Sequence, residues 1–165
     1  EKMNIFYLDK DPIESARFHC DKHVCKMIVE TAQMLCTAHR IVDPQWAEDM
    51  KLMKAGFINH PMTIWVRTSQ ENYRWAFRLF QGLLDEYEHR YGRLHKCIEH
   101  EMGLLSPPPI PDIGFTEVPL CMPNHCKNVL SHIRSYREYY RKEKRYFAKW
   151  TKRDVPYWFD DPELV

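Results

Sequence analysis

The sequence predicts a mainly α-helical protein: a single-domain bundle of about five helices, with a short N-terminal extended segment and a Pro-rich loop before the last long helix. Three observations predict this fold. Several segments open with a capping residue followed by proline. Apolar residues recur at helical spacing. A length of 165 residues suits one domain, so residues 1–165 are expected to fold together.

The N-terminal half of the chain begins with a short apolar run over 4–8 that is compatible with a single strand. Asp11 and Pro12 then open a long helix, and the apolar period extends it to about residue 40. A second helix is predicted over 44–54 after Asp43. A third, short helix is predicted from Pro61 to about residue 67.

The C-terminal half of the chain is predicted from the same kinds of signal. A long helix over 69–91 begins at Ser69 and stops at Gly92, and a weaker amphipathic segment follows over 94–105. Six prolines make 106–126 an ordered, extended loop that packs through its apolar residues. The last long helix covers about 127–147, and the aromatic tail over 148–165 is expected to pack on the body.

Composition excludes a disordered chain, because 44% of the residues are hydrophobic and 28% are charged. No leader-like apolar segment and no run of about 18 apolar residues is evident, so we expect no membrane partner and a cytoplasmic location. The six cysteines fall mostly in helical patterns, which favours reduced thiols.

The net charge of +1 conceals a basic segment over 127–153, which holds ten Lys and Arg against two Glu. Aromatic residues interleave with these charges, as in surfaces that bind a nucleic-acid backbone and stack bases. A solvent-facing terminal helix explains the same pattern, and that alternative stays open. The candidate nucleic-acid-binding residues are Arg137, Arg141, Lys144, Lys149, Trp150, Lys152 and Arg153.

A stripe of titratable side chains on the first long helix is the candidate catalytic site. Histidines four residues apart share a helix face and can chelate a metal, whereas a lysine beside imidazoles can act as an amine nucleophile or a phosphate contact. No carboxylate or cysteine stands at a diagnostic metal spacing, so a metal is possible but not favoured, and the cofactor is left undefined. A polar helix face without a special role is the alternative. The candidate residues are His19, Lys22, His23, Lys26 and Glu30.

The segment 59–75 is the candidate substrate-binding site, because it combines aromatic rings, an amide and an arginine. Rings stack on a base, an amide reads its edge, and arginine takes a phosphate. The alternative places the tryptophans in the core and makes Asn72 a cap. The candidate residues are Asn59, His60, Trp65, Arg67, Ser69, Asn72 and Tyr73.

Five motifs spread over nearly the whole chain carry a family resemblance: HCDKHVxKM from residue 19, NHPxxxWxR from 59, NYxW from 72, EYxxRYG from 86 and KWTK from 149. With them the chain resembles a family of small, uncharacterised proteins of tailed phages, cyanophages among them. The resemblance implies DNA or nucleotide metabolism in the cytoplasm of a host cell, and it implies no particular reaction.

Together these features predict a phage-encoded enzyme that acts on DNA bases, of the glycosylase or base-modification type. It would have a His/Lys active site on the first long helix and a basic C-terminal helix that binds DNA. One alternative is an enzyme acting on free nucleotides or nucleotide sugars, and another is a non-enzymatic nucleic-acid-binding or host-takeover protein. The expected partner is therefore DNA, another nucleic acid or a nucleotide. Both enzyme hypotheses require the first helix and the 59–75 segment to face one pocket.

Overall fold

The computed structural model describes residues 3–165, and within them the chain is all-helical and has no strand. The N-terminal part consists of five helices: α1 (Pro12–Phe18), α2 (Asp21–Val42), α3 (Pro44–Asp49), α4 (Pro61–Thr68) and α5 (Gln70–Tyr91). The C-terminal part holds two more α-helices and three short helical turns. These are η1 (Lys96–His100), α6 (Glu101–Leu104), η2 (Asn124–Cys126), α7 (His132–Tyr139) and the π-helical η3 (Tyr140–Lys144). The predicted mainly α fold is confirmed.

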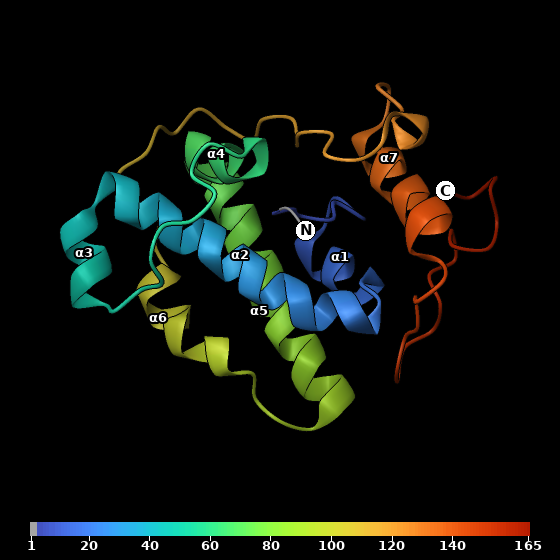
Figure 1. Cartoon of the computed structure of the whole chain (residues 1–165), viewed down its shortest axis with the longest axis horizontal. Helices are drawn as coiled ribbons and strands as arrows, with labels where there is room; N and C mark the ends of the chain where they lie inside the picture. The colour runs from blue at the N-terminus through green and yellow to red at the C-terminus, as the bar shows by residue number, and fades with distance from the viewer. Residues whose placement is uncertain (1–2) are drawn as a thin grey trace.

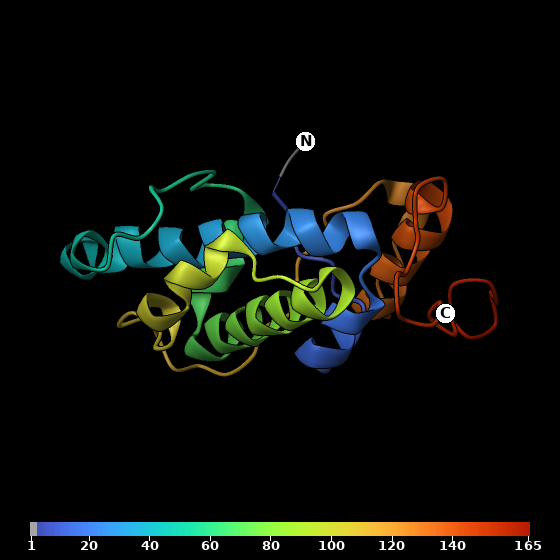
Figure 2. The same cartoon turned by 90° about the horizontal axis from the view of Figure 1, so that it is seen from below.

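The two long helices form the centre of the molecule, and α1 and α4 pack against them (Figure 1). Figure 2 shows α2 lying over α5, with α3 at one end of the molecule and α7 with the C-terminal tail at the other. The core between these elements is rich in large aromatic side chains. Trp158 of the tail, Tyr73 of α5 and Tyr136 of α7 are among its fully buried residues.

Local signals place several helix ends where the sequence predicts them. Asp11 accepts the amide N–H of Ile13 at 2.9 Å and caps α1. Ser69 caps α5, and Gly92 ends it with φ +70°, a conformation that glycine adopts without steric cost. The helix predicted over 69–91 is therefore confirmed.

The single long helix predicted over 12–40 is wrong, because the chain breaks at His19 and Cys20. Both residues have extended backbone, and α2 starts afresh at Asp21. The amide N–H of Asp21, which has no partner inside its own helix, donates to the carbonyl of Lys149 at 2.7 Å. A contact with the C-terminal tail thus stabilises the break.

Three other predicted helices have different bounds in the structure. The 44–54 helix ends at Asp49, because the chain turns to bury Leu52. The 94–105 segment is a 3₁₀ turn followed by one short α-helix. The helix predicted over 127–147 starts only at His132 and ends in the π-turn η3.

The extended segments lie against the helices. The 4–8 run has no strand partner among the described residues, and Ile5 and Leu8 are buried in the core. The proline-rich loop is held along α5, where Asn72 donates its amide to Thr116 and accepts the amide N–H of Thr116. In the tail, the indole of Trp150 donates to the carbonyl of Phe18 at 2.9 Å.

Candidate active site

A cavity of about 630 Å³ lies where the N-terminal segment, α4, the proline-rich loop and α7 meet. We call it the N-terminal cavity. It is lined by residues that include Asn4, His60, Pro61, Cys121, Pro123 and Tyr139. Its volume lies in the range of about 300–1,000 Å³ that is usual for small-molecule sites.

Asn4 connects this cavity to the carboxylate of Glu30 on α2. The backbone N–H of Asn4 donates to Glu30 Oε1 at 3.1 Å, and the Asn4 side chain donates to the Cys121 carbonyl at 3.0 Å. The Glu30 side chain is only 13% exposed. Glu30 therefore lies one hydrogen bond from the cavity wall. In these partly buried surroundings, the electrostatic interactions of a carboxylate are stronger than in bulk water.

Lys26 lies one helical turn before Glu30, with its Nζ atom 3.8 Å from Glu30 Oε2. The i, i+4 spacing places both side chains on one face of α2, as the sequence predicts. The opposite face of the helix buries Val24 and Ile28 in the core. Because Val24 and Ile28 hold that face against the core, the Lys26–Glu30 pair on the other face points away from the core.

The other candidates on this stretch divide between the interior and the surface. His19 and His23 are buried, and the ring of His23 stacks on Phe6 with centroids 4.4 Å apart. Nδ1 of His23 lies 2.7 Å from the hydroxyl of Tyr140. Lys22 remains exposed, with its Nζ 4.4 Å from the centre of the Phe147 ring.

Burial sets the protonation of the two histidines. Loss of solvent lowers the pKa of His19 to about 4. Loss of solvent, with the nearby charges of His19, Lys144, Lys26 and Lys22, lowers the pKa of His23 to about 2. Both rings are therefore neutral near pH 7 and pack as core residues. The structure does not bring them to the N-terminal cavity.

The three lysines that act on His23 form a basic surface, which we call the lysine cluster: Lys22, Lys26 and Lys144. Lys144 Nζ lies 4.8 Å from the centre of the Tyr139 ring, and Tyr139 lines the N-terminal cavity. Among residues 3–165, neither Lys22 nor Lys144 has an ion pair. The cluster thus borders the cavity with charge that can meet a polyanion.

The substrate-binding candidates of the 59–75 segment are mostly interior. Trp65 donates its indole N–H to the Thr116 carbonyl, and the hydroxyl of Tyr73 donates to the Leu104 carbonyl. The side chain of Asn72 is satisfied by Trp65 and Thr116. These three side chains join α4 and α5 to the proline-rich loop and to α6.

The remaining candidates of this segment lie near the ends of α4. His60 caps α4 by accepting the Met62 amide and lines the N-terminal cavity. Asn59 is exposed, and Arg67 donates to the Ile58 carbonyl. Ser69 caps α5 and donates to Gly114. Of the predicted site residues, His60 lines the N-terminal cavity, whereas Glu30 of α2 is connected to it only through the hydrogen bond from the Asn4 backbone.

Much of the basic segment is committed to contacts within the protein. Arg137 donates to the Leu8 carbonyl and pairs with Asp9. Arg141 pairs with Glu138 at 2.6 Å. Only part of the charge predicted for nucleic-acid binding is thus available, and it belongs to Lys144 and to the exposed Lys149 and Lys152.

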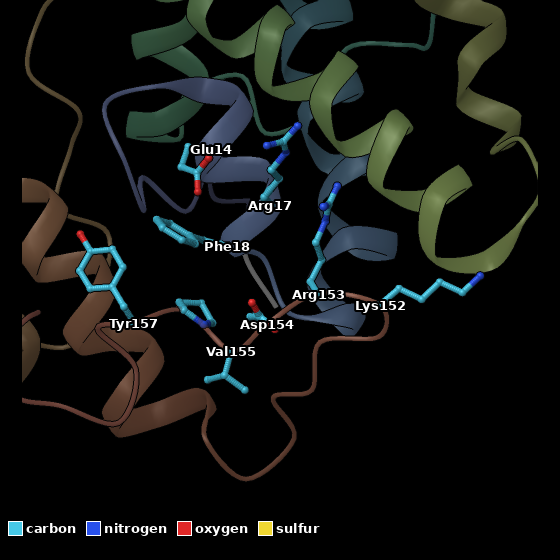
Figure 3. Close-up of a pocket in the computed structure, with 9 residues that line it drawn as sticks. Glu14, Arg17, Phe18, Lys152, Arg153, Asp154, Val155 and Tyr157 are labelled. Atoms are coloured by element: carbon cyan, nitrogen blue, oxygen red, sulfur yellow. The ribbon is translucent and has the colours of Figure 1, made fainter.

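The tail forms a second cavity of about 740 Å³ with α1, lined by residues that include Arg17, Phe18, Lys152, Arg153 and Tyr157 (Figure 3). In Figure 3 Lys152 extends away from this cavity, whereas Arg153 points back toward the helices, where it pairs with Glu86 at 2.7 Å. This cavity shares no lining residue with the N-terminal cavity. Arg153 therefore serves to dock the tail on α5.

Sequence reasoning missed Asn4 and Tyr139 as members of the site. Tyr139 lies next to Tyr140, and only the structure decides that Tyr139 lines the cavity while Tyr140 is buried.

Within residues 3–165, no group of three or more His, Cys, Asp or Glu side chains is placed to hold a metal ion. None of the described helices is long and apolar enough to cross a membrane.

A partly buried carboxylate beside a cavity, with lysines along its edge, is an arrangement suited to an enzyme that acts on a polyanion. Residues 3–99 match the family of pyrimidine dimer DNA glycosylases, and the chain belongs to that family. It is therefore a glycosylase-type protein directed at DNA bases. Neither a curated protein nor a solved structure matches the chain. The matched residues include Asn4, Lys26, Glu30 and His60, whereas Tyr139 and the 120–123 loop lie outside the match.

Proposed function

We propose that the protein is a DNA glycosylase that cleaves the N-glycosidic bond of damaged pyrimidines, and that the N-terminal cavity receives the base. The observation that carries this proposal is the Lys26–Glu30 pair beside the cavity, within the residues that match the glycosylase family. A base inside a duplex cannot be reached, so it must leave the stack before the reaction. The family description supports a pyrimidine dimer as the lesion.

Glu30 is the catalytic carboxylate in this proposal. Breaking the bond between the base and C1′ leaves positive charge on the deoxyribose, and a carboxylate held nearby stabilises that charge. The bond's electron pair leaves with the base, and a nucleophile takes its place at C1′. Lys26 places its Nζ beside the carboxylate. It can transfer a proton to Glu30 and attack C1′ as the neutral amine, or bind the adjoining phosphate as the ammonium.

The lysine cluster holds the DNA backbone in this proposal. Lys144 and Lys22 flank the aromatic rings of Tyr139 and Phe147, next to the cavity. Phosphate contacts of this kind fix the register of DNA without reading its sequence. The positions of Lys149 and Lys152 support a continuation of this surface along the tail. Phage origin and a host-cell cytoplasmic location stay predictions that rest on the resemblance alone.

The test uses a duplex oligonucleotide with one cyclobutane thymine dimer and measures cleavage of the N-glycosidic bond, as strand breakage at the abasic site after alkali. The detached base stays joined to its neighbour by the cyclobutane ring, so free base is not the readout. Glu30→Gln keeps an oxygen that accepts the Asn4 amide but removes the charge, so the fold and DNA binding are retained. We expect the rate of glycosidic-bond cleavage to fall by a factor of about 10²–10⁴. Glu71→Gln, which alters an exposed carboxylate on α5, is the matched control and should leave the rate unchanged.

Borohydride trapping then identifies the nucleophile. An amine of the protein that replaces the base forms an imine with the opened sugar, and its reduction links protein to DNA. Peptide mapping locates the attachment, and Lys26→Gln shows whether that side chain is required. A wild-type protein that binds DNA but cleaves no N-glycosidic bond would overturn the proposal in favour of a non-enzymatic DNA-binding protein. A Glu30→Gln variant with full activity would remove Glu30 from the reaction.

A further inference from the structure

Phe115 of the proline-rich loop is an aromatic side chain that the protein holds at its surface. It is 45% exposed, and it lines two cavities that share no lining residue with the N-terminal cavity. The larger of the two has a volume of about 460 Å³ and the smaller a volume of about 130 Å³. We call Phe115 together with these two cavities the Phe115 site.

Hydrogen bonds fix the residue that follows Phe115. The amide N–H of Thr116 donates to Asn72 Oδ1 at 2.9 Å, and Asn72 Nδ2 donates to Thr116 Oγ1 at 2.8 Å. The carbonyl of Thr116 accepts the indole N–H of Trp65 at 3.1 Å. The backbone that carries the exposed ring is therefore ordered before any ligand arrives, which lowers the entropy cost of binding.

The residue that precedes Phe115 is fixed as well. The carbonyl of Gly114 accepts the hydroxyl of Ser69, and Gly114 has φ +87°, a conformation that favours glycine. The ring of Trp65 packs edge-on against the Phe115 ring, with centroids 5.5 Å apart and an angle of 82° between the planes. Side chains that the sequence suggests for substrate binding thus position Phe115 instead.

Each of the two cavities also contains a cation without an ion pair. Lys10 lines the larger cavity and Arg78 of α5 lines the smaller one, and both side chains are exposed. Among residues 3–165, neither of them has a carboxylate partner, whereas the neighbouring Arg74 pairs with Glu71 at 2.9 Å. The ring of Phe115 is therefore flanked by two charges that can meet an anion.

An exposed ring between cations is the arrangement by which proteins hold an unpaired nucleic-acid strand, because bases stack on the ring and phosphates meet the charges. Base faces inside a duplex are covered by their neighbours, so a ring fixed at the surface fits a single strand. Val129 and Leu130, which are 76% and 93% exposed, add an apolar wall to the larger cavity. A purely apolar protein partner would leave Lys10 and Arg78 without a counterpart.

We propose that the Phe115 site binds a single-stranded nucleic acid, with one base stacked on Phe115 and the phosphates on its two sides bound by Lys10 and Arg78. This site goes beyond the proposed glycosylase function and does not depend on it. Glu71 and Glu117 also line the cavities, so the net charge is small and the binding weakens readily with salt. The family match ends at residue 99 and does not include Phe115.

Fluorescence anisotropy with a short, labelled oligothymidylate measures the affinity of this site. Phe115→Ala removes the ring, and we expect it to weaken binding at least about fivefold, the lower end for the loss of one base–ring stack. Phe115→Tyr keeps an aromatic face and should bind as wild type does. Arg78→Gln removes one phosphate contact, so the slope of log affinity against log salt should become shallower by about 0.7.

Photocrosslinking then locates the bound base. An oligothymidylate that carries one 5-iodouracil forms a covalent bond to an adjacent aromatic side chain under ultraviolet light, and peptide mapping should find that bond on Phe115. An oligouridylate of the same length, measured in parallel, shows whether the preferred strand is DNA or RNA. Crosslinks confined to Tyr139 or Phe147, beside the lysine cluster, would overturn the assignment of the site.

Control variants lie beyond the C-terminal end of α5, away from the Phe115 site. Leu94→Ala removes an apolar side chain that is 61% exposed, and Lys96→Gln removes an exposed charge, so neither should change the affinity for oligothymidylate. Arg78 is exposed and has no ion pair, so Arg78→Gln should keep the melting temperature of wild type. It therefore tests the site even where Phe115→Ala unfolds.

Each outcome bears on one of the two proposals. Wild-type affinity and salt slope in both Phe115→Ala and Arg78→Gln would overturn the single-strand site, and so would a wild-type protein that binds neither oligonucleotide. Cleavage of the thymine-dimer duplex should be the same in wild type and Phe115→Ala, because Phe115 does not line the N-terminal cavity. A wild-type protein that cleaves no duplex but binds oligothymidylate through Phe115 would overturn the glycosylase function and leave this site standing.

Discussion

The ion network around Arg90 predicts a large loss of stability when this arginine is replaced. The Arg90 side chain on α5 is 0% exposed and donates to Glu86 at 3.0 Å, to Asp21 at 3.0 Å and to the Arg17 carbonyl at 3.0 Å. Arg153 of the tail binds Glu86 from its other side. One guanidinium thus ties α1, α2 and α5 together beneath the tail.

Arg90→Met keeps most of the length of the side chain and removes all of its donors. Removing one partner of a buried ion pair costs about 3–5 kcal/mol, because the other charge stays buried without compensation. Glu86 keeps Arg153, and Asp21 keeps its hydrogen bonds from Thr151, so we expect the lower end, about 3 kcal/mol. For a chain of this size, 1 kcal/mol shifts the melting temperature by about 2–4 °C, which predicts a fall of roughly 6–12 °C.

Thermal unfolding followed by circular dichroism measures this fall. The control is Arg74→Met, because Arg74 lies on the same helix and its pair with Glu71 is exposed. Exposed pairs contribute up to about 1 kcal/mol, so the control should melt within a few degrees of wild type. An Arg90→Met protein that melts within about 2 °C of wild type would refute the assigned role of the network.

The network also predicts a dependence on pH. Burial alone would raise the pKa of Glu86, but hydrogen bonds and charge from Arg153 and Arg90 outweigh it and hold the pKa below its ordinary value. A carboxylate with a lowered pKa stabilises the fold above about pH 4.5 and loses that contribution as the pH falls through its folded pKa. The difference between wild type and Arg90→Met should therefore narrow as the pH falls below the ordinary pKa of a glutamate, about 4.5.

Two further predictions concern buried side chains. Burial lowers the pKa of His19 to about 4 and that of His23 to about 2, so the unfolded chain binds more protons than the folded chain below pH 6.5. The free energy of unfolding, measured in urea, should therefore fall between pH 7 and pH 5. An unchanged or higher free energy at pH 5 would contradict the buried, neutral state of the two rings. Burial raises the pKa of Cys36 to about 12, and Cys20 and Cys126 are buried as well. A thiol reagent should therefore label these three cysteines only after the protein unfolds. Fast labelling of Cys36 in the native protein would show that the core is open to solvent.

Helix ends that depend on neighbouring residues were predictable from the sequence. Asp11 with Pro12, and Ser69 with Gly92, act through hydrogen bonds and backbone conformations that span only a few residues. The break at His19 and Cys20 was not predictable, because the Lys149 carbonyl that satisfies the start of α2 lies far away in the chain. Apolar periodicity continues across the break and conceals it.

The candidate site was predictable in part for the same reason. Lys26 and Glu30 share a face of α2 by spacing alone, and the structure keeps them together. The burial of His23 depends on Phe6 and Tyr140, which come from the N-terminal segment and from η3. Sequence spacing says nothing about such partners.

Taken by itself, the sequence determined the helical class, the capped helix ends and the total charge of the basic segment, because these follow from local hydrogen bonding and composition. Only the tertiary structure decided which of those charges stay free. Arg137 and Arg153 are neutralised by Asp9 and Glu86 from distant parts of the chain, whereas Lys144 is left beside the N-terminal cavity. The physical reason is that an ion pair depends on the separation of two groups in space, and that separation is set by how α7 and the tail pack on the N-terminal segment and α5.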